Sequence, residues 1–311
     1  MKKSEHLIHK SRKNLKFNGY FDRNFKKLYT ILDQNKIQSN RVLLSIVLPV
    51  YNEENTVRRV LSSLPKHDSV EVVVVDDHST DKSFEEIKTL REDLNLKLIR
   101  HSKNGGYGKA ILTGIANSTG RIIITMDSDG QHRPEDIFNL VEPILTKKAD
   151  ITVGSRYIGT YNYKLPVSTR IGEAVIEKFM IILFRLKITN NQGGFRAFHK
   201  NTLEIFEDIK FEDFAFTTEL LLKAALSKFK IKEIPIHLLD REYDSSKINL
   251  PKLILNLMLC ILYYTIQWVN RPYVNKWMIK RLIFLKKLPI YGKPKKIQDV
   301  VIRADKIISI A

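Results

Sequence analysis

The segment RIIITMDSDGQH, residues 121–132, joins a run of apolar residues to two closely spaced acids. Its first half, Arg121–Met126, is short, rich in β-branched residues and nearly free of polar ones, which predicts a strand buried on both faces. Further strands are predicted on both sides of it: Val42–Val50, Val70–Val75, Leu96–Arg100 and Ile151–Ser155. The chain is therefore expected to build one sheet from several buried strands.

Helical patterns separate these strands. Val57, Val60 and Leu61 follow the i, i+3, i+4 spacing that places apolar side chains on one face of a helix. Pro134, followed by two acids, suits the first turn of another helix. The alternation predicts an α/β fold, a mostly parallel sheet with helices on both faces. In such sheets ligands bind beyond the carboxyl ends of the strands.

Polar residues gather where the predicted strands end. The clusters are Tyr51-Asn52-Glu53, Asp76-Asp77, Asp127-Ser128-Asp129 and Ser155-Arg156. One acidic turn would carry little meaning, because Asp and Gly are common turn residues. Several clusters converging on one edge of a sheet indicate a binding site instead.

Asp127 and Asp129 have the most informative spacing. Side chains alternate along a strand, so both carboxylates point the same way if the extended chain continues through Ser128. A hard cation such as Mg²⁺ would relieve their repulsion, and it takes one or two protein carboxylates while phosphate oxygens and water complete its shell. The alternative is a pair of solvated acids in a turn, with Gly130 making the bend.

Composition and charge limit the possible classes of protein. The 311 residues suffice for one large domain or two average ones, and 43% are hydrophobic, as in folded proteins. A single cysteine, Cys260, excludes an intramolecular disulfide framework. The formal net charge of +18 attracts phosphate-bearing partners. Its basic residues concentrate in residues 1–40 and after Arg271, outside the acid-bearing middle, so nucleic acid is not an expected partner.

Six motifs occur in an order and spacing that resemble a family 2 glycosyltransferase of GT-A fold. They are LSIVLPVYNEENTV (44–57), VEVVVVDDHSTD (70–81), IIITMDSDGQHRPED (122–136), VGSRY (153–157), NNQGGFRAF (190–198) and DREYDSSK (240–247). Within the family, the chain looks most like the dolichol-phosphate mannosyltransferase and polyprenyl-phosphate glycosyltransferase branch. The segment GGYGKA (105–110) lacks the spacing of a phosphate-binding loop and is typical of a turn.

The resemblance implies roles for particular residues. Those expected to bind the nucleotide are Pro49, Tyr51, Glu53, Val75 and Asp77, together with Ser128, whose backbone would contact the metal-bound diphosphate. A divalent cation, Mg²⁺ or Mn²⁺, is expected on Asp127 and Asp129, with Gln131 nearby. The expected catalytic residues are Asp129, Arg156, Arg170, Arg241 and Lys247, of which Arg170 matches the acceptor-phosphate position. Arg196 is a further candidate cation, with a structural salt bridge as its alternative role.

The implied reaction is metal-dependent, inverting transfer of one hexose from a GDP-mannose or UDP-glucose type donor to a polyprenyl (dolichyl) phosphate. A cation and Arg or Lys donors would stabilise the departing diphosphate. A lipid phosphate is already mostly ionised near neutral pH, so no strong general base is needed. The alternative is a hydroxyl acceptor on a glycan or glycolipid, with Glu219 as candidate base. The chain departs from the family at Asp244, where glycine is usual.

Three regions are expected: a basic lead (1–40), the GT-A domain (41–250), and a hydrophobic helix with a basic tail (251–311). Leu253–Val269 has no formal charge but is at the lower limit for a bilayer span, and the basic tail favours an in-plane amphipathic helix. Val175–Leu186 is a second candidate for lipid contact, with an ordinary buried helix as the alternative. Because the N-terminus lacks an apolar signal core, a peripheral or monotopic protein on the cytoplasmic side of the cell membrane is expected.

Overall fold

The computed structural model describes residues 23–39, 41–90, 95–161, 167–213, 215–239 and 250–269. The chain divides into two compact units, Met1–Cys260 and Ile261–Ala311. The first unit contains the whole described sheet, and every predicted site residue belongs to it.

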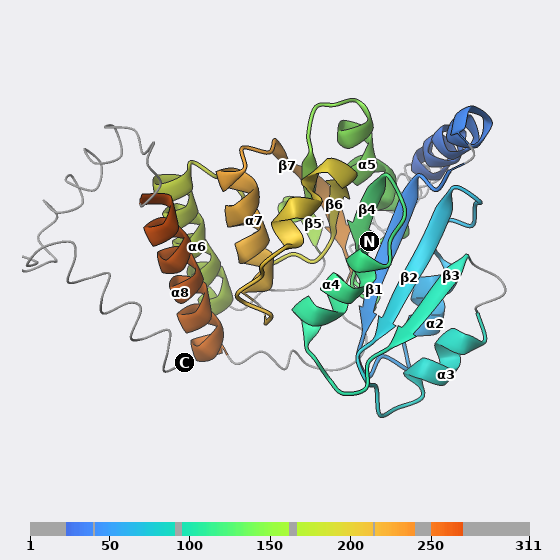
Figure 1. Cartoon of the computed structure of the whole chain (residues 1–311), viewed down its shortest axis with the longest axis horizontal. Coiled ribbons are helices and arrows are strands. Elements are labelled where there is room, and N and C mark those ends of the chain that lie inside the picture. Colours follow the sequence, from blue (N-terminus) through green and yellow to red (C-terminus); the bar gives the residue numbers. More distant parts are fainter. Residues whose placement is uncertain are drawn as a thin grey trace, which may run out of the picture. The chain divides into compact units, whose positions relative to one another are not determined.

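A seven-stranded sheet forms the centre of the described part of this unit, in the order β3-β2-β1-β4-β6-β5-β7 (Figure 1). The strands are β1 (Leu44–Val50), β2 (Val70–Asp76), β3 (Leu96–Arg100), β4 (Ile122–Thr125), β5 (Ile151–Tyr161), β6 (Arg196–His199) and β7 (Ile231–Leu238). Strands β3, β2, β1 and β4 are parallel to one another, and β5 is parallel to β7. Only β6 is antiparallel to its neighbours β4 and β5 among the strands described. The prediction of a mostly parallel α/β sheet is confirmed.

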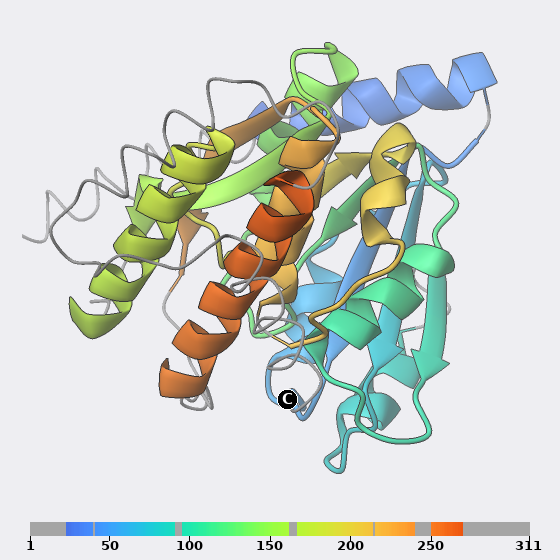
Figure 2. The same cartoon turned by 60° about the vertical axis from the view of Figure 1, so that its left-hand side comes forward.

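Helices connect these strands. They are α2 (Val57–Ser62), α3 (Ser83–Lys88), α4 (Tyr107–Ala116), η1 (Pro134–Asp136), α5 (Ile137–Leu145), α6 (Val167–Phe184), η2 (Lys200–Phe206), α7 (Phe216–Leu226) and α8 (Leu250–Val269). A further helix covers residues 23–39. Helix α4 packs against β1 and β2, as Figure 2 shows.

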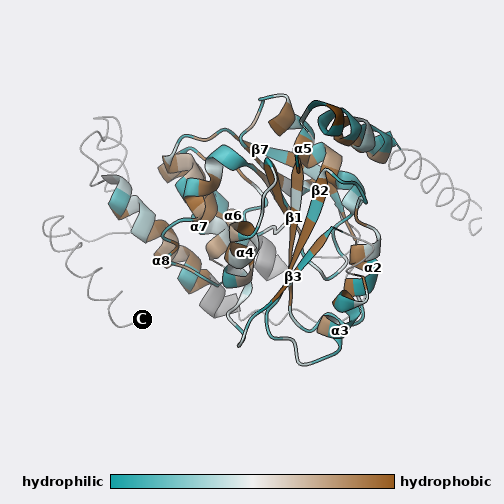
Figure 3. Ribbon diagram, turned by 45° about the vertical axis from the view of Figure 1, so that its right-hand side comes forward, coloured by the Kyte–Doolittle hydropathy of each residue, from teal (hydrophilic) through white to brown (hydrophobic). Residues whose placement is uncertain are grey.

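The core lies on both faces of the sheet. On one face, Ile46 and Leu48 of β1 pack in the same buried cluster as Leu61 of α2 and Val141 of α5. On the other face, Val47 packs in a second cluster, whose helical members include Ile111 of α4 and Phe216 of α7. Successive residues of β1 therefore enter different clusters, which explains why the strand is apolar apart from Ser45 and why much of the sheet is brown in Figure 3.

Two strands were not predicted. β6 is only four residues long and begins with Arg196, and β7 alternates buried and exposed residues instead of forming a continuous apolar run. Both lie after α6, and β6 brings the antiparallel pairing into the sheet. The beginning of β6 lies beside the end of β4, since Thr125 pairs with Arg196. The segment NNQGGFR is thereby placed next to Asp127.

Candidate active site

The loops after β1 and β4 are bound together at the carboxyl ends of their strands. The Ser128 hydroxyl donates to the Pro49 carbonyl at 2.8 Å, and the Thr56 hydroxyl donates to the Ser128 carbonyl at 2.9 Å. The backbone N–H of Asp77, after β2, donates to the Val50 carbonyl at 2.8 Å. The polar clusters predicted after three separate strands therefore lie at one edge of the sheet.

The loop after β1 contains Tyr51 and Glu53, two of the predicted nucleotide-binding residues. Tyr51 is 43% exposed, whereas Pro49 and Val75 are buried and pair with each other in the β1–β2 ladder. The Glu53 carboxylate accepts the Thr56 hydroxyl at 2.8 Å, and the Glu53 N–H donates to Ser83 Oγ at 2.7 Å. Of these predicted nucleotide-binding residues, Tyr51 is therefore the exposed one, and Pro49 and Val75 are buried in the sheet beside its loop.

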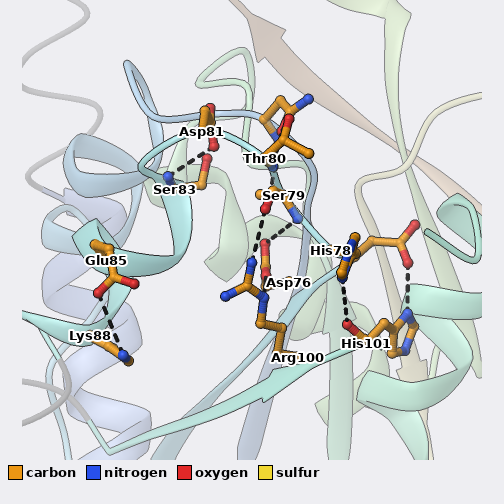
Figure 4. Close-up of polar contacts among 12 residues, drawn as sticks. Asp76, His78, Ser79, Thr80, Asp81, Ser83, Glu85, Lys88, Arg100 and His101 are labelled. Carbon is orange, nitrogen blue, oxygen red and sulfur yellow. Dashed lines mark hydrogen bonds and ion pairs between the residues drawn. The ribbon is translucent and has the colours of Figure 1, made fainter. Parts of the chain in front are cut away.

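Asp76, the last residue of β2, and Asp77, which follows it, are both buried. Asp76 forms an ion pair with Arg100 at 3.0 Å and accepts the Ser79 N–H at 3.2 Å (Figure 4). The Asp77 carboxylate accepts the N–H groups of Gly105 and Gly106 at 2.8 and 2.7 Å. His101 Nδ1 lies 2.7 Å from Asp77 Oδ1. Asp77, a predicted nucleotide-binding residue, thus also fixes the glycine loop that precedes α4.

Asp127 lies at the end of β4 in contact with groups from other elements. The Tyr107 hydroxyl donates to Asp127 Oδ1 at 3.1 Å, and the Asp127 N–H donates to His132 Nδ1 at 3.3 Å. Burial first, and then the charge of Asp127, raise the pKa of Tyr107 well above its usual value, and Asp129 adds to the effect. Both carboxylates therefore lie within electrostatic reach of one hydroxyl group.

The loop from Asp127 to Gln131 is a turn. The strand ends at Thr125 and the backbone bends from Ser128 to Gly130, so the condition that extension continues through Ser128 is not met. Gly130 has a φ of 79°, where glycine is favoured, as the turn interpretation expected. Asp129 Oδ1 accepts the Gln131 N–H at 3.0 Å. The turn, rather than strand alternation, brings the two acids to the same edge.

Gln131 connects this turn to the end of β7. Its side-chain amide donates to the Leu239 carbonyl at 3.2 Å, and its own carbonyl accepts the Leu239 N–H at 2.9 Å. Leu239 is the last described residue before residues 240–249. The predicted phosphate-binding residues Arg241 and Lys247, and the departure at Asp244, lie outside the described residues.

The donor set around the turn fits a magnesium- or manganese-type ion. Asp127 and Asp129 supply hard carboxylate oxygens, and both side chains are partly exposed. The described residues contain no cluster of three or more His, Cys, Asp or Glu that would enclose a metal. A site with two carboxylates suits an ion that arrives with phosphate oxygens and water in its shell.

Arg156, on β5, is the predicted phosphate-binding cation whose side chain is described near α6. Its guanidinium donates to Glu173 Oε1 at 2.8 Å, and the Tyr157 hydroxyl donates to the other oxygen of Glu173. Burial raises the pKa of Glu173, although the charge of Arg156 acts in the opposite direction. Arg170 lies on α6, but its side chain is outside the described residues.

Arg196 is buried, and its guanidinium is bonded to backbone carbonyls, in place of the expected salt bridge or phosphate contact. It is 1% exposed, and its guanidinium donates to three backbone carbonyls, those of Asn191, Gly193 and Thr217, at 2.7 to 2.8 Å. Burial lowers the pKa of Arg196 to about 10. The expectation that it holds substrate phosphate is wrong, because its donors already hold the turn before β6.

Glu219, the candidate base for a hydroxyl acceptor, is fully buried at 0% exposure. Its two carboxylate oxygens accept the N–H groups of Lys210 and Phe211 at 2.9 and 2.8 Å. The side chain therefore orders the turn before α7 and is not placed to receive a proton from a substrate.

Four residues of the site were missed in the sequence: Tyr107, His132, Glu173 and Gly194. Three of them lie in motifs that had been noticed: Tyr107 in GGYGKA, His132 in IIITMDSDGQHRPED and Gly194 in NNQGGFRAF. Tyr107 and Gly194 lie beside Asp127 from distant parts of the chain, and no local periodicity records such a contact.

Comparisons with known proteins identify the family. The model of glycosyl transferase family 2 matches residues 45–206. The chain is 30% identical over 223 residues to UDP-N-acetylglucosamine–dolichyl-phosphate N-acetylglucosaminyltransferase of Methanococcus voltae, covering 66% of this chain and 89% of that protein. It is 30% identical over 214 residues to dolichol-phosphate mannosyltransferase of Pyrococcus furiosus, covering 66% of this chain and 59% of that protein.

A solved structure of glucosyl-3-phosphoglycerate synthase from Mycobacterium tuberculosis, in complex with Mn²⁺, UDP and phosphoglyceric acid, has a similar fold. The TM-score is 0.57 at 22% identity, covering 75% of this chain and 81% of that chain. Fold and sequence together define a glycosyltransferase with a GT-A-like α/β fold. The chain belongs to glycosyl transferase family 2. The names of its relatives confirm the resemblance to the polyprenyl-phosphate branch.

Proposed function

We propose that the protein transfers one hexose from a nucleotide-diphosphate sugar to a polyprenyl phosphate, with inversion at the sugar carbon and with a divalent cation at Asp127 and Asp129. The observation that carries the proposal is the joining of the loops after β1 and β4 through Ser128 and Thr56, which places these acids beside the Tyr51 loop. Similarity to transferases named for dolichyl phosphate supports the acceptor class.

The cation would be held by Asp127 and Asp129, and when bound it would supply Lewis-acid stabilisation of the leaving diphosphate. A structure of the related fold contains Mn²⁺ with UDP, which supports this choice of ion. Gln131 ties the turn that carries both acids to Leu239. We place the nucleotide on Tyr51 and Glu53, next to Pro49 and Val75, with Asp77 contributing through the Gly105-Gly106 loop that its carboxylate fixes.

The chain's own cations would orient the two phosphate groups. Arg156 is the candidate whose side chain is described, and its guanidinium donates to Glu173 of α6 at 2.8 Å. Arg170, Arg241 and Lys247 are proposed to hold the remaining phosphate oxygens through charge-assisted hydrogen bonds. Each such donor is worth on the order of 3 kcal/mol of transition-state stabilisation, by analogy with single oxyanion donors.

A hydroxyl acceptor is less well supported. It would require a carboxylate base, and Glu219 is engaged with two backbone N–H groups. An ionised lipid phosphate needs no base. This agrees with the site, where the described acids either hold loops in place or lie at the carboxyl ends of the strands.

Peripheral contact with a membrane surface is part of the proposal. Within the described residues, no helix has the length and apolar character needed to cross a bilayer. Apolar residues are exposed on α8, where Leu255 is 59% and Ile254 39% exposed, and on α6, where Val175 is 44% exposed. Apolar side chains on helices, together with basic flanks, are typical of proteins that bind the surface of anionic membranes.

The test is a transfer assay with the purified full chain. A panel of radiolabelled nucleotide sugars is incubated with polyprenyl phosphate, with and without EDTA, and the organic phase is counted. We expect lipid-linked product from one donor, loss of product with EDTA, and recovery on adding Mn²⁺. Free polyprenol, which lacks the phosphate, is the matched control acceptor. Transfer to polyprenol equal to that on the phosphate would contradict the acceptor, and equal transfer in EDTA would contradict the metal.

A further inference from the structure

Asp127 receives a hydrogen bond from a side chain in the segment GGYGKA. The Tyr107 hydroxyl donates to Asp127 Oδ1 at 3.1 Å. Tyr107 is the first residue of α4, and its ring packs edge-on against Phe216 of α7 with centroids 6.5 Å apart. The hydroxyl is therefore presented from a rigid element and does not depend on a mobile side chain.

Gly194 closes the other side of the same carboxylate. A Cβ atom at this position would lie 2.5 and 2.7 Å from the two oxygens of Asp127 and 2.6 Å from the Tyr107 hydroxyl. The backbone here is fixed, because Thr125 Oγ1 donates to the Gly194 carbonyl at 2.6 Å and Arg196 Nε donates to the Gly193 carbonyl at 2.8 Å. Only a residue without a side chain leaves space for the carboxylate in this position.

The segment that carries Tyr107 is also tied to the nucleotide side of the site. Gly105 and Gly106 donate both of their N–H groups to the Asp77 carboxylate at 2.8 and 2.7 Å. Gly106 has a φ of 88°, and the Gly108 N–H donates to the Glu212 carbonyl at 3.1 Å. Three consecutive residues, 105–107, thus connect one predicted ligand-binding acid to the other.

We infer that Tyr107 is a positioning residue for the divalent cation: with Gly194 it holds the Asp127 carboxylate in one orientation, and residues 105–107 link that orientation to Asp77. The inference rests on the proposed function, because it assumes a cation at Asp127. A hydrogen bond to one carboxylate oxygen, with the Gly194 backbone packed against both oxygens, restricts the rotation of the group. Outer-shell partners of this kind change metal affinity by about 10- to 100-fold when removed.

The experiment measures Mn²⁺ alone binding to the full chain, by the electron paramagnetic resonance signal of free Mn²⁺. For Tyr107→Phe we expect a Kd about 10-fold higher than that of the wild type. Gly194→Ala, which displaces the carboxylate itself, should weaken binding at least as much. Tyr29→Phe is the matched control, because it also removes one hydroxyl, which there accepts the Lys66 N–H at 3.1 Å. Its Kd should equal that of the wild type.

Rescue separates positioning from a general structural role. Raising the Mn²⁺ concentration should restore the transfer rate of Tyr107→Phe, and its melting temperature should match that of Tyr29→Phe. A wild-type Kd for Tyr107→Phe, alongside lost Mn²⁺ binding by Asp127→Asn, overturns the inference while the proposed metal site stands. A wild-type Kd for Asp127→Asn overturns the metal site itself and the inference with it.

Discussion

Asp77 and Asp127 both lie at the carboxyl ends of parallel strands, Asp77 directly after β2 and Asp127 two residues after the end of β4, yet their surroundings differ. The Asp77 side chain is 5% exposed and accepts two backbone N–H groups besides its contact with His101. The Asp127 side chain is 31% exposed, accepts a tyrosine hydroxyl and faces the Gly194 backbone. The first carboxylate is enclosed by protein donors, whereas the second is oriented by protein but still open.

The difference shows how one sequence pattern can produce two kinds of acid. A carboxylate has about four acceptor positions, so one that binds three protein donors has little capacity left for a ligand. One that is partly exposed can still reach a cation while outer-shell groups orient it. We therefore expect Asp77 to act mainly through the loop that it fixes and Asp127 to act directly on the ligand.

The largest effect is expected from Asp127→Asn. Loss of one of two carboxylate ligands removes Lewis-acid stabilisation worth several kcal/mol, so kcat/KM should fall on the order of 10³-fold. The free energy of unfolding should change little, because the side chain is partly exposed. Asp77→Asn should show the opposite pattern, with about 2 kcal/mol lost in urea unfolding, since its new amide N–H₂ faces backbone donors. Unchanged transfer by Asp127→Asn combined with lost Mn²⁺ binding by Asp77→Asn would reverse the assigned roles.

The strands at the middle of the sheet were predictable because burial on both faces leaves a continuous apolar run. The runs predicted at Val42–Val50 and Val70–Val75 match β1 and β2 to within two residues at either end. Strand β6 could not be found in this way. Its Arg196 is buried only because backbone carbonyls at residues 191, 193 and 217 surround it, and that arrangement is set by the folded turn and by α7.

The candidate site was predictable as a set of strand ends but not as a set of contacts. Asp127 and Asp129 stood out by their spacing, whereas Tyr107 is 20 positions from its partner Asp127 and lies in a segment typical of a turn. Glu173 lies 17 positions from Arg156 and on another element. Contacts between residues this far apart in the sequence depend on how α4 and α6 pack. A single sequence contains no local pattern that predicts them.

A second pair, the buried Arg196 and the half-exposed Arg58, tests whether an arginine surrounded by protein acceptors contributes more to the free energy of unfolding than one at the surface. Arg196→Met leaves three buried carbonyls without their donor, and each costs about 1 kcal/mol or more, so we expect a loss of at least about 3 kcal/mol in urea unfolding. Arg58→Met removes a guanidinium that is half exposed and bonded to Glu86 and Thr89. That variant should lose less than about 1 kcal/mol. Equal losses in the two variants would show that the hydrogen bonds of Arg196 to the three carbonyls stabilise the fold no more than the surface contacts of Arg58.

Asp136 extends the comparison to a buried acid outside the candidate active site. It is 2% exposed and accepts the His237 N–H at 2.9 Å and the Asn139 amide at 3.0 Å, and burial raises its pKa to about 6 from 3.8. Between these values the folded state binds more protons than the unfolded state, so stability falls as the pH rises. From pH 4.5 to pH 7 this carboxyl should account for a loss of about 2 kcal/mol.

Asp136→Asn supplies the measurement. Its free energy of unfolding should lack that part of the pH dependence, so the difference between the wild type and the variant should change by about 2 kcal/mol between urea titrations at pH 4.5 and pH 7. Other titrating groups cancel in this difference. A constant difference across the range would mean that Asp136 is ionised in both states.

The smallest effect is expected at Glu173, where under the proposed function an acid would compete with substrate for the Arg156 guanidinium. Glu173 accepts a hydrogen bond from Arg156 at 2.8 Å, and its carboxylate charge would oppose the binding of a substrate phosphate to the same guanidinium. Glu173→Gln removes that charge, so the KM for the anionic substrate should fall about threefold, within the range of a weak charge interaction. Burial raises the pKa of Glu173, so acidification of the wild type should protonate it and lower KM in the same direction. The variant should lack this pH dependence, whereas Glu177→Gln, one turn further along α6, should keep it. A KM that rises in Glu173→Gln would mean that Glu173 holds Arg156 ready for the phosphate and does not compete with it.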